Sequence, residues 1–129
     1  MRFLLDTHIF LWLLAEPERL SGQIGSLEDP ANELFLSAAS SWEIAIKSKM
    51  GRLDLPDDPR IYVPDSMRAI GVDPLSVEHS HALAVDELPP HHRDPFDRLL
   101  VAQGRALRLR IVTADRQIAL YDVETLLVQ

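Results

Sequence analysis

Short apolar runs alternate along the chain with longer segments whose apolar residues recur every three or four positions. The short runs predict strands buried on both faces, and the longer segments predict helices packed against them. The expected strands are Phe3–Leu5, Leu34–Leu36, Val72–Leu75, Arg110–Thr113 and Glu124–Val128. The expected helices are Thr7–Ala15, Ser21–Leu27, Ala39–Met50, Asp65–Ile70, Val77–Glu87, Asp94–Leu107 and Arg116–Leu120.

The segment ahead of the fourth expected helix is rich in proline. It carries Pro56, Pro59 and Pro64, which predicts a loop before a helix near Asp65–Ile70. Alternation of strands and helices is typical of an α/β domain. We therefore expect one domain over residues 1–129, built around a mostly parallel sheet of four or five strands.

The first apolar block is interrupted by polar residues at its centre. It reads MRFLLDTHIFLWLL, with Asp6, Thr7 and His8 between the first expected strand and the first expected helix. Burying an unpaired polar group costs on the order of 2–7 kcal/mol, and an unpaired carboxylate costs more. Asp6 is therefore expected to be hydrated, paired or part of a charged site.

The composition fits a soluble globular domain. Of the 129 residues, 47% are hydrophobic and 26% are charged. The chain has no cysteine, which excludes disulfides, thiolate nucleophiles and cysteine-bound zinc. Because no apolar stretch approaches the roughly 20 residues of a membrane span, and the first run lacks the pattern of a leader, we expect a cytoplasmic protein without a membrane partner.

The charge balance argues against a nucleic-acid partner. The formal net charge is −7, whereas phosphate binding relies on a basic surface. Six arginines nevertheless gather in the last third of the chain, close in sequence to two candidate acids, and a local basic rim around an acidic pocket would resolve the conflict. They are Arg93, Arg98, Arg105, Arg108, Arg110 and Arg116.

Four carboxylates share a position relative to the expected elements. Asp6 and Asp115 follow strands, while Glu43 and Asp97 lie in the first turns of helices. Residues that follow parallel strands gather along one edge of the sheet, where ligand crevices form. Like charges repel at short range, and a bound Mg²⁺ or Mn²⁺ ion commonly offsets this repulsion in proteins. The pattern therefore indicates a metal site.

Each acid also has a structural interpretation. Asp6 and Asp115 could be helix N-caps, and Glu43 lies at capping-box spacing from Ser40. Asp94 precedes a proline, as an N-cap residue often does. Asp97 is harder to explain in this way, because it lies inside a helix.

Histidines and tryptophans give weaker signals. His91 and His92 are expected to be loop residues rather than a ligand pair. Trp12 and Trp42 lie in apolar helical contexts, which favours packing over base stacking.

Four segments together resemble the PIN-domain ribonucleases, and more narrowly the VapC-type toxins of toxin–antitoxin modules. They are LLDTHIFLW, SAASSWEIAIKSKMGRLDLP, HHRDPFDRLLVAQ and IVTADRQIALY, in that order from the start of the chain to Tyr121. The resemblance implies a three-layer α/β/α fold and hydrolysis of RNA phosphodiester bonds with Mg²⁺ or Mn²⁺. It also implies a cognate antitoxin as partner.

The resemblance further implies roles for individual residues. The four catalytic acids map to Asp6, Glu43, Asp97 and Asp115, of which the three aspartates hold the metal. Thr7, Thr113 and Asp94 would support the site, and Arg93, Arg98 and Arg116 would contact RNA.

Three alternatives remain open at this stage. The apolar helix HIFLWLLA is either buried or forms an interface with an antitoxin or with a second copy in a homodimer. The domain could be a catalytically silent PIN scaffold that binds a protein or RNA. A receiver-like signalling domain also places an acid after a strand, but it needs a late lysine, and the last lysine here is Lys49.

Overall fold

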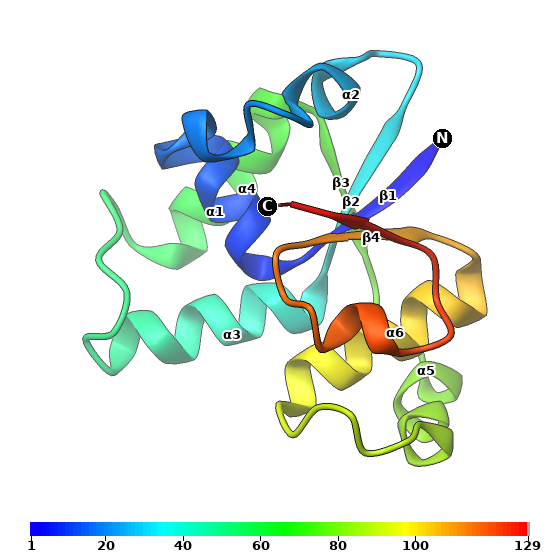
Figure 1. Ribbon diagram of the computed structural model, residues 1–129. Helices are drawn as coiled ribbons and strands as arrows, with labels where there is room; N and C mark the ends of the chain where they lie inside the picture. The colour runs from blue at the N-terminus through cyan, green and yellow to red at the C-terminus, as the bar shows by residue number, and fades with distance from the viewer. Residues whose placement is uncertain (129) are drawn as a thin grey trace.

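Five parallel strands form the centre of the computed structural model, which describes residues 1–128 (Figure 1). Their order in the sheet is β3-β2-β1-β4-β5, and every neighbouring pair runs parallel. The strands are β1 (Arg2–Leu5), β2 (Glu33–Ser37), β3 (Val72–Leu75), β4 (Arg110–Thr113) and β5 (Thr125–Leu127). The expected α/β class and parallel sheet are confirmed.

Helices cover both faces of the sheet. The α-helices are α1 (Thr7–Ala15), α2 (Ile24–Glu28), α3 (Ala38–Lys49), α4 (Pro59–Ile70), α5 (His79–Ala84) and α6 (Pro95–Leu107). The short 3₁₀ helices are η1 (Pro17–Leu20), η2 (Val85–Glu87) and η3 (Ile118–Leu120). In Figure 1, α1 to α4 lie on one side of the strands and α5 and α6 lie on the other, which gives the three-layer arrangement.

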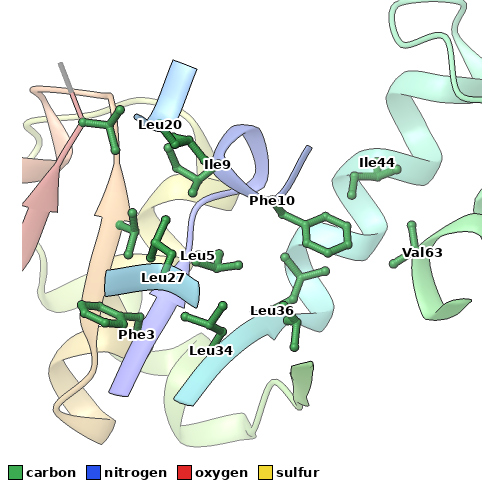
Figure 2. Close-up of a cluster of buried hydrophobic side chains, with 13 residues drawn as sticks. Phe3, Leu5, Ile9, Phe10, Leu20, Leu27, Leu34, Leu36, Ile44 and Val63 are labelled. Atoms are coloured by element: carbon green, nitrogen blue, oxygen red, sulfur yellow. The ribbon is translucent and has the colours of Figure 1, made fainter. Parts of the chain in front are cut away.

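Alternate residues of the central strand build two separate cores. Phe3 and Leu5 of β1 pack in one cluster with residues of α1 to α4, including Phe10 (Figure 2). Leu4 points the other way and packs with residues of α6, including Leu100. Because successive side chains of a strand point to opposite faces, a continuous apolar run at β1 fills both cores.

The strand order reverses beside the central strand β1. From β1 the chain proceeds outward to β2 and β3, and then returns to the other side of β1 as β4 and β5. In open α/β sheets, ligands bind at the carboxyl ends of the strands where the order reverses. Here that point lies between β1 and β4, where the amide of Asp6 donates to the carbonyl of Val112 at 2.9 Å.

Helix α4 begins earlier than its prolines suggested. Asp58 caps it by accepting a hydrogen bond from the amide of Arg60 at 2.9 Å. Pro59 occupies the first turn, where backbone N–H groups have no partner within the helix, so the missing N–H of proline costs no hydrogen bond. Pro64 lies inside the helix. The expected loop over 51–64 is therefore wrong for its last six residues.

Other element ends also differ from the sequence-based expectations. Helix α3 begins at Ala38 with Ser37 as its N-cap, so the capping-box interpretation of Glu43 is wrong. The expected helix over 77–87 divides into α5 and η2, the one over 21–27 begins at Ile24, and the one over 116–120 is the short η3. Within residues 1–128, no helix is long and apolar enough to cross a membrane.

Gly104 allows α6 to lie close to the sheet. A Cβ atom at this position would come within 3.0 Å of side-chain carbons of Ile111 and Val123. Glycine inside a helix costs about 1 kcal/mol relative to alanine. The close packing of α6 on β4 requires glycine here and offsets this cost.

We predict that Gly104→Ala lowers the free energy of unfolding in urea, because overpacking a core typically costs about 1–3 kcal/mol and outweighs the gain in helix propensity. Gly25→Ala in α2 is the matched control, since nothing lies within 4 Å of its Cβ position. The control should be neutral or stabilising by up to about 1 kcal/mol. Equal stabilisation by both substitutions would contradict the packing role of Gly104.

Candidate metal-dependent active site

Four acids lie close together near the carboxyl ends of β1 and β4. Asp97 illustrates this best, because burial raises its pKa and the negative charges of four nearby carboxylates raise it further, to about 8. These neighbours are Asp6, Asp94, Glu43 and Asp115. The structure thus brings all four predicted catalytic acids to one place.

Asp6 is held by the opposite end of the chain. Its carboxylate oxygen Oδ2 accepts a hydrogen bond from Thr113 Oγ1 at 2.7 Å, and only 5% of the residue is exposed. Burial raises the pKa of Asp6, and the bond from Thr113 opposes that shift. Asp6 occupies the N-cap position of α1, as one interpretation expected, but its side chain makes no capping hydrogen bond to the helix.

Glu43 is tied down from two sides. Thr7 Oγ1 donates to Oε1 at 2.6 Å, and Lys47 Nζ donates to Oε2 at 2.6 Å. The Glu43 side chain is 3% exposed, and its hydrogen bond raises the pKa of Lys47. Because both oxygens of Glu43 already have partners and Lys47 balances its charge, Glu43 is the least available of the four acids.

Asp94 organises the start of α6. Its Oδ1 accepts from the amides of Phe96 at 2.8 Å and Asp97 at 3.3 Å, which confirms it as the N-cap. Its negative charge also raises the pKa of Asp97. Asp94 therefore fixes the first turn of α6, which carries Asp97, and is not itself one of the four predicted catalytic acids.

His92 joins the acids, although the sequence indicated only a loop residue. Its Nε2 lies 2.7 Å from Asp115 Oδ2 and 3.0 Å from Asp97 Oδ2. Its Nδ1 accepts from the amide of Asp94 at 3.1 Å, so Nδ1 is unprotonated and the proton of the neutral ring is on Nε2. His92 therefore donates a hydrogen bond toward two carboxylates. That contact depends on a loop between two helices, for which the sequence carries no periodic signal.

The same group offers donors for a cation. One ligand atom each from His92, Asp97 and Asp115 lie within 4.8 Å of one another. Asp6 is close enough to raise the pKa of Asp97. Clustered carboxylates of this kind favour a hard divalent ion, which would offset their mutual repulsion.

Comparison with known proteins agrees with this geometry. Residues 3–124 match the family described as PIN domain. The chain belongs to the PIN-domain family. The expected family is thereby confirmed.

Two relatives of this PIN domain come from Mycobacterium tuberculosis. Ribonuclease VapC22 is 31% identical over 118 residues, which covers 89% of this chain and 88% of the relative. Ribonuclease VapC16 is 51% identical over 55 residues, which covers 43% of this chain and 39% of the relative. The second match is therefore confined to less than half of either protein.

Solved structures share the fold of this PIN domain at low sequence identity. VapBC2 from Rickettsia felis, bound to a DNA fragment from its promoter, has a TM-score of 0.75 at 12% identity and covers 100% of both chains. VapBC from Salmonella typhimurium, also bound to DNA, has a TM-score of 0.69 at 13% identity and covers 100% of this chain and 99% of that chain.

The receiver-like alternative is wrong. Receiver sheets have the strand order 2-1-3-4-5, whereas this PIN domain has β3-β2-β1-β4-β5. Its acids lie at the reversal between β1 and β4.

Arg98 is occupied by the protein itself. Its two terminal nitrogens donate to the carbonyls of Val85, Leu88, Pro89 and His92 at 3.1–3.4 Å, and to the hydroxyl of Tyr121 at 3.3 Å. These bonds fasten the loop before α6, which carries His92. The geometry does not favour the expected RNA contact for Arg98 and instead gives it a positioning role. Arg93 and Arg116 remain exposed beside the acids.

We predict that Arg98→Met lowers the free energy of unfolding in urea by about 2 kcal/mol or more, because it removes several hydrogen bonds from a charged donor. Arg93→Met is the control, since this arginine is exposed and its replacement should change stability by less than about 0.5 kcal/mol. Equal, small effects of the two substitutions would argue against the positioning role.

The pH dependence of stability should report the state of Asp97. Its pKa rises from 3.8 to about 8 on folding, so between these values the folded chain keeps a proton that the unfolded chain has released. Stability of the metal-free protein should therefore fall as the pH rises, by up to about 1.4 kcal/mol per pH unit. Asp97→Asn removes this contribution. In EDTA, the variant should gain stability over the parent protein as the pH rises from 5 to 7, and parallel curves would contradict the assignment.

Proposed function

We propose that this PIN-domain protein is a metal-dependent endoribonuclease and the toxin of a toxin–antitoxin pair. The observation that carries the proposal is the convergence of Asp6, Asp97 and Asp115 at the sheet reversal, with one of them poised near pKa 8. Similarity to Ribonuclease VapC22 over 89% of the chain supports RNA as the substrate. The fold and the acids together make it a hydrolase acting on phosphodiester bonds.

Asp6, Asp97 and Asp115 are the residues that would hold Mg²⁺ or Mn²⁺, directly or through water. Carboxylate oxygens suit both ions. His92 is not a ligand in this scheme, because its Nε2 carries the proton while Nδ1 accepts from the amide of Asp94. When bound, the metal lowers the pKa of a water molecule and offsets the charge that develops on the phosphate.

Protein groups orient the carboxylates around that position. Thr113 holds Oδ2 of Asp6, which leaves Oδ1 for the site. The amide of Gln117 holds Oδ1 of Asp115 at 2.8 Å, and His92 donates to Oδ2. Thr7 and Lys47 fix Glu43, which completes the acidic wall of the pocket. Such fixed groups are effective because they need little rearrangement during the reaction.

RNA binding relies on local rather than overall charge. The net charge is −7, but Arg93 and Arg116 are exposed and directly follow His92 and Asp115 in the sequence. These two arginines would receive the phosphates on either side of the cleaved bond. If the domain were a catalytically silent scaffold, which is the alternative, the clustered acids would have no function.

The partner in the cell would be a cognate antitoxin. Structures similar to this chain include FitAB bound to a DNA fragment, with a TM-score of 0.66 at 18% identity over 96% of this chain and 93% of that chain. The side chains of Leu11 to Leu14 on α1 are half-buried against the core, so a second copy or the antitoxin would cover their remaining surface. We place the pair in the cytoplasm.

We predict that the isolated protein cleaves cellular RNA at discrete sites with Mg²⁺ or Mn²⁺, and that EDTA abolishes cleavage. Asp97→Asn should lower the rate at least about 100-fold, because it removes a charged group needed for metal binding. Sequencing of new 5′ ends checks this. Asp54→Asn, an exposed acid outside the acidic cluster, is the control and should cleave normally.

Undiminished cleavage by folded Asp97→Asn would refute the site. No cleavage by the parent protein in either metal, with binding of the metal intact, would favour the silent scaffold.

A further inference from the structure

Two aromatic side chains, one of them largely exposed, meet close to the acidic cluster. Trp42 of α3 is 63% exposed, which is unusual for the largest apolar side chain and excludes packing in the core. Its ring meets that of Phe96 of α6 edge to face, with centroids 5.2 Å apart and an angle of 79°. The pair bridges two helices while leaving most of the indole open to solvent.

Chain adjacency fixes this pair beside the acids. Trp42 directly precedes Glu43, and Phe96 directly precedes Asp97. Because the charge of Glu43 acts on Asp97, the two acids lie close together, and the residues directly before them in the chain lie close to the cluster. An aromatic surface at this place has no role in the core, whose two clusters do not include Trp42 or Phe96.

Exposed basic residues lie close along the chain to the pair or to the acids. Arg93 and Arg116 are exposed and adjacent in sequence to other residues of the site, and Lys49 is exposed two turns beyond Trp42 on the same side of α3. Proteins that bind single-stranded nucleic acids combine a basic surface for the backbone with aromatic side chains on which bases stack. Exposed arginines next to site residues in the sequence, together with an open indole close to the acids, fit that combination.

We infer that Trp42, supported by Phe96, stacks on an unpaired base of the RNA next to the cleaved phosphate. The inference rests on the proposed ribonuclease function and deepens it: Trp42 is a positioning residue for substrate. A base in a regular duplex is already stacked on both sides, so this contact selects RNA that is unpaired at the cleavage site.

The first test compares Trp42→Ala and Trp42→Phe in steady-state cleavage of an RNA that contains one mapped site. Loss of one base stack corresponds to roughly a 10- to 100-fold decrease in kcat/KM. The loss for Trp42→Ala should appear mainly as a higher KM, because the stack forms in the bound substrate as well as in the transition state. Trp42→Phe should retain most of the activity.

Leu83→Ala is the matched control, since Leu83 is an apolar residue of α5 that is 75% exposed. It should leave kcat/KM unchanged. Thermal unfolding and light scattering of each variant check folding and oligomeric state. A change in oligomeric state for Trp42→Ala would overturn the inference in favour of an interface between copies of the chain.

A second test separates stacking from a general structural role. Single abasic nucleotides are placed at each position around the cleavage site. At one position, the abasic nucleotide should lower the cleavage rate of the parent protein by about the same factor as Trp42→Ala does with the intact RNA. With Trp42→Ala protein, the same abasic RNA should be cleaved only slightly more slowly than the intact RNA. Additive effects at every position would overturn the inference.

Binding distinguishes failure of the inference from failure of the proposed function. In the Asp97→Asn background, which keeps the RNA intact, a fluorescein-labelled 12-nucleotide RNA of mixed sequence is titrated with Mg²⁺ present. Adding Trp42→Ala should weaken binding roughly 10-fold or more. If the parent protein cleaves RNA but Trp42→Ala changes neither binding nor cleavage, only the inference fails. If no RNA is cleaved while binding still depends on Trp42, only the nuclease function fails. If RNA neither binds nor is cleaved, both fail.

Discussion

The burial of several carboxylates close together is the constraint on which this structure depends. Burial, and then the negative charges of its neighbours, raise the pKa of Asp97 to about 8, which records the free-energy cost of placing these groups together. Such a cluster persists only when the rest of the fold is stable enough to impose it. Here Asp6 and Asp115 follow β1 and β4, which lie at the centre of the sheet and bury apolar side chains on both faces, so these two acids are attached to the core of the fold.

Hydrogen bonds from the protein determine which oxygens remain free. Thr113 donates a hydrogen bond to Asp6 and His92 donates one to Asp115, so each of these carboxylates has one oxygen engaged by a side chain of the protein. Glu43 is neutralised by Lys47 one helical turn away. The acids are therefore not equivalent: Glu43 is paired and enclosed, whereas Asp97 and Asp115 offer oxygens within 4.8 Å of each other. The neighbours that cause this difference come from three elements, α1, α3 and β4, and from two loops.

The strands could be predicted from the sequence, and so could the proximity of the acids. The reason is that residues which follow parallel strands lie along the same edge of the sheet. The start of α4 could not, since Pro64 argued for a loop while packing of Val63 in the core favours the helix. His92 was missed because its position depends on the bonds that Arg98 makes to carbonyls of the loop before α6, which the sequence pattern does not indicate. The exposure of Trp42 was missed for a related reason: an apolar helical context looks the same whether a side chain points inward or outward.

The bond between Thr113 and Asp6 joins residues 107 positions apart, and it closes the site. A chain emerging from a ribosome at roughly 5–20 residues per second therefore spends several seconds with Asp6 exposed but without its partners. Because β4 pairs directly with β1, the central strand lacks one of its two neighbours until that late segment arrives. An enzyme that cleaves RNA would thus acquire its complete set of acids only after nearly all of its sequence has emerged from the ribosome, which itself contains RNA.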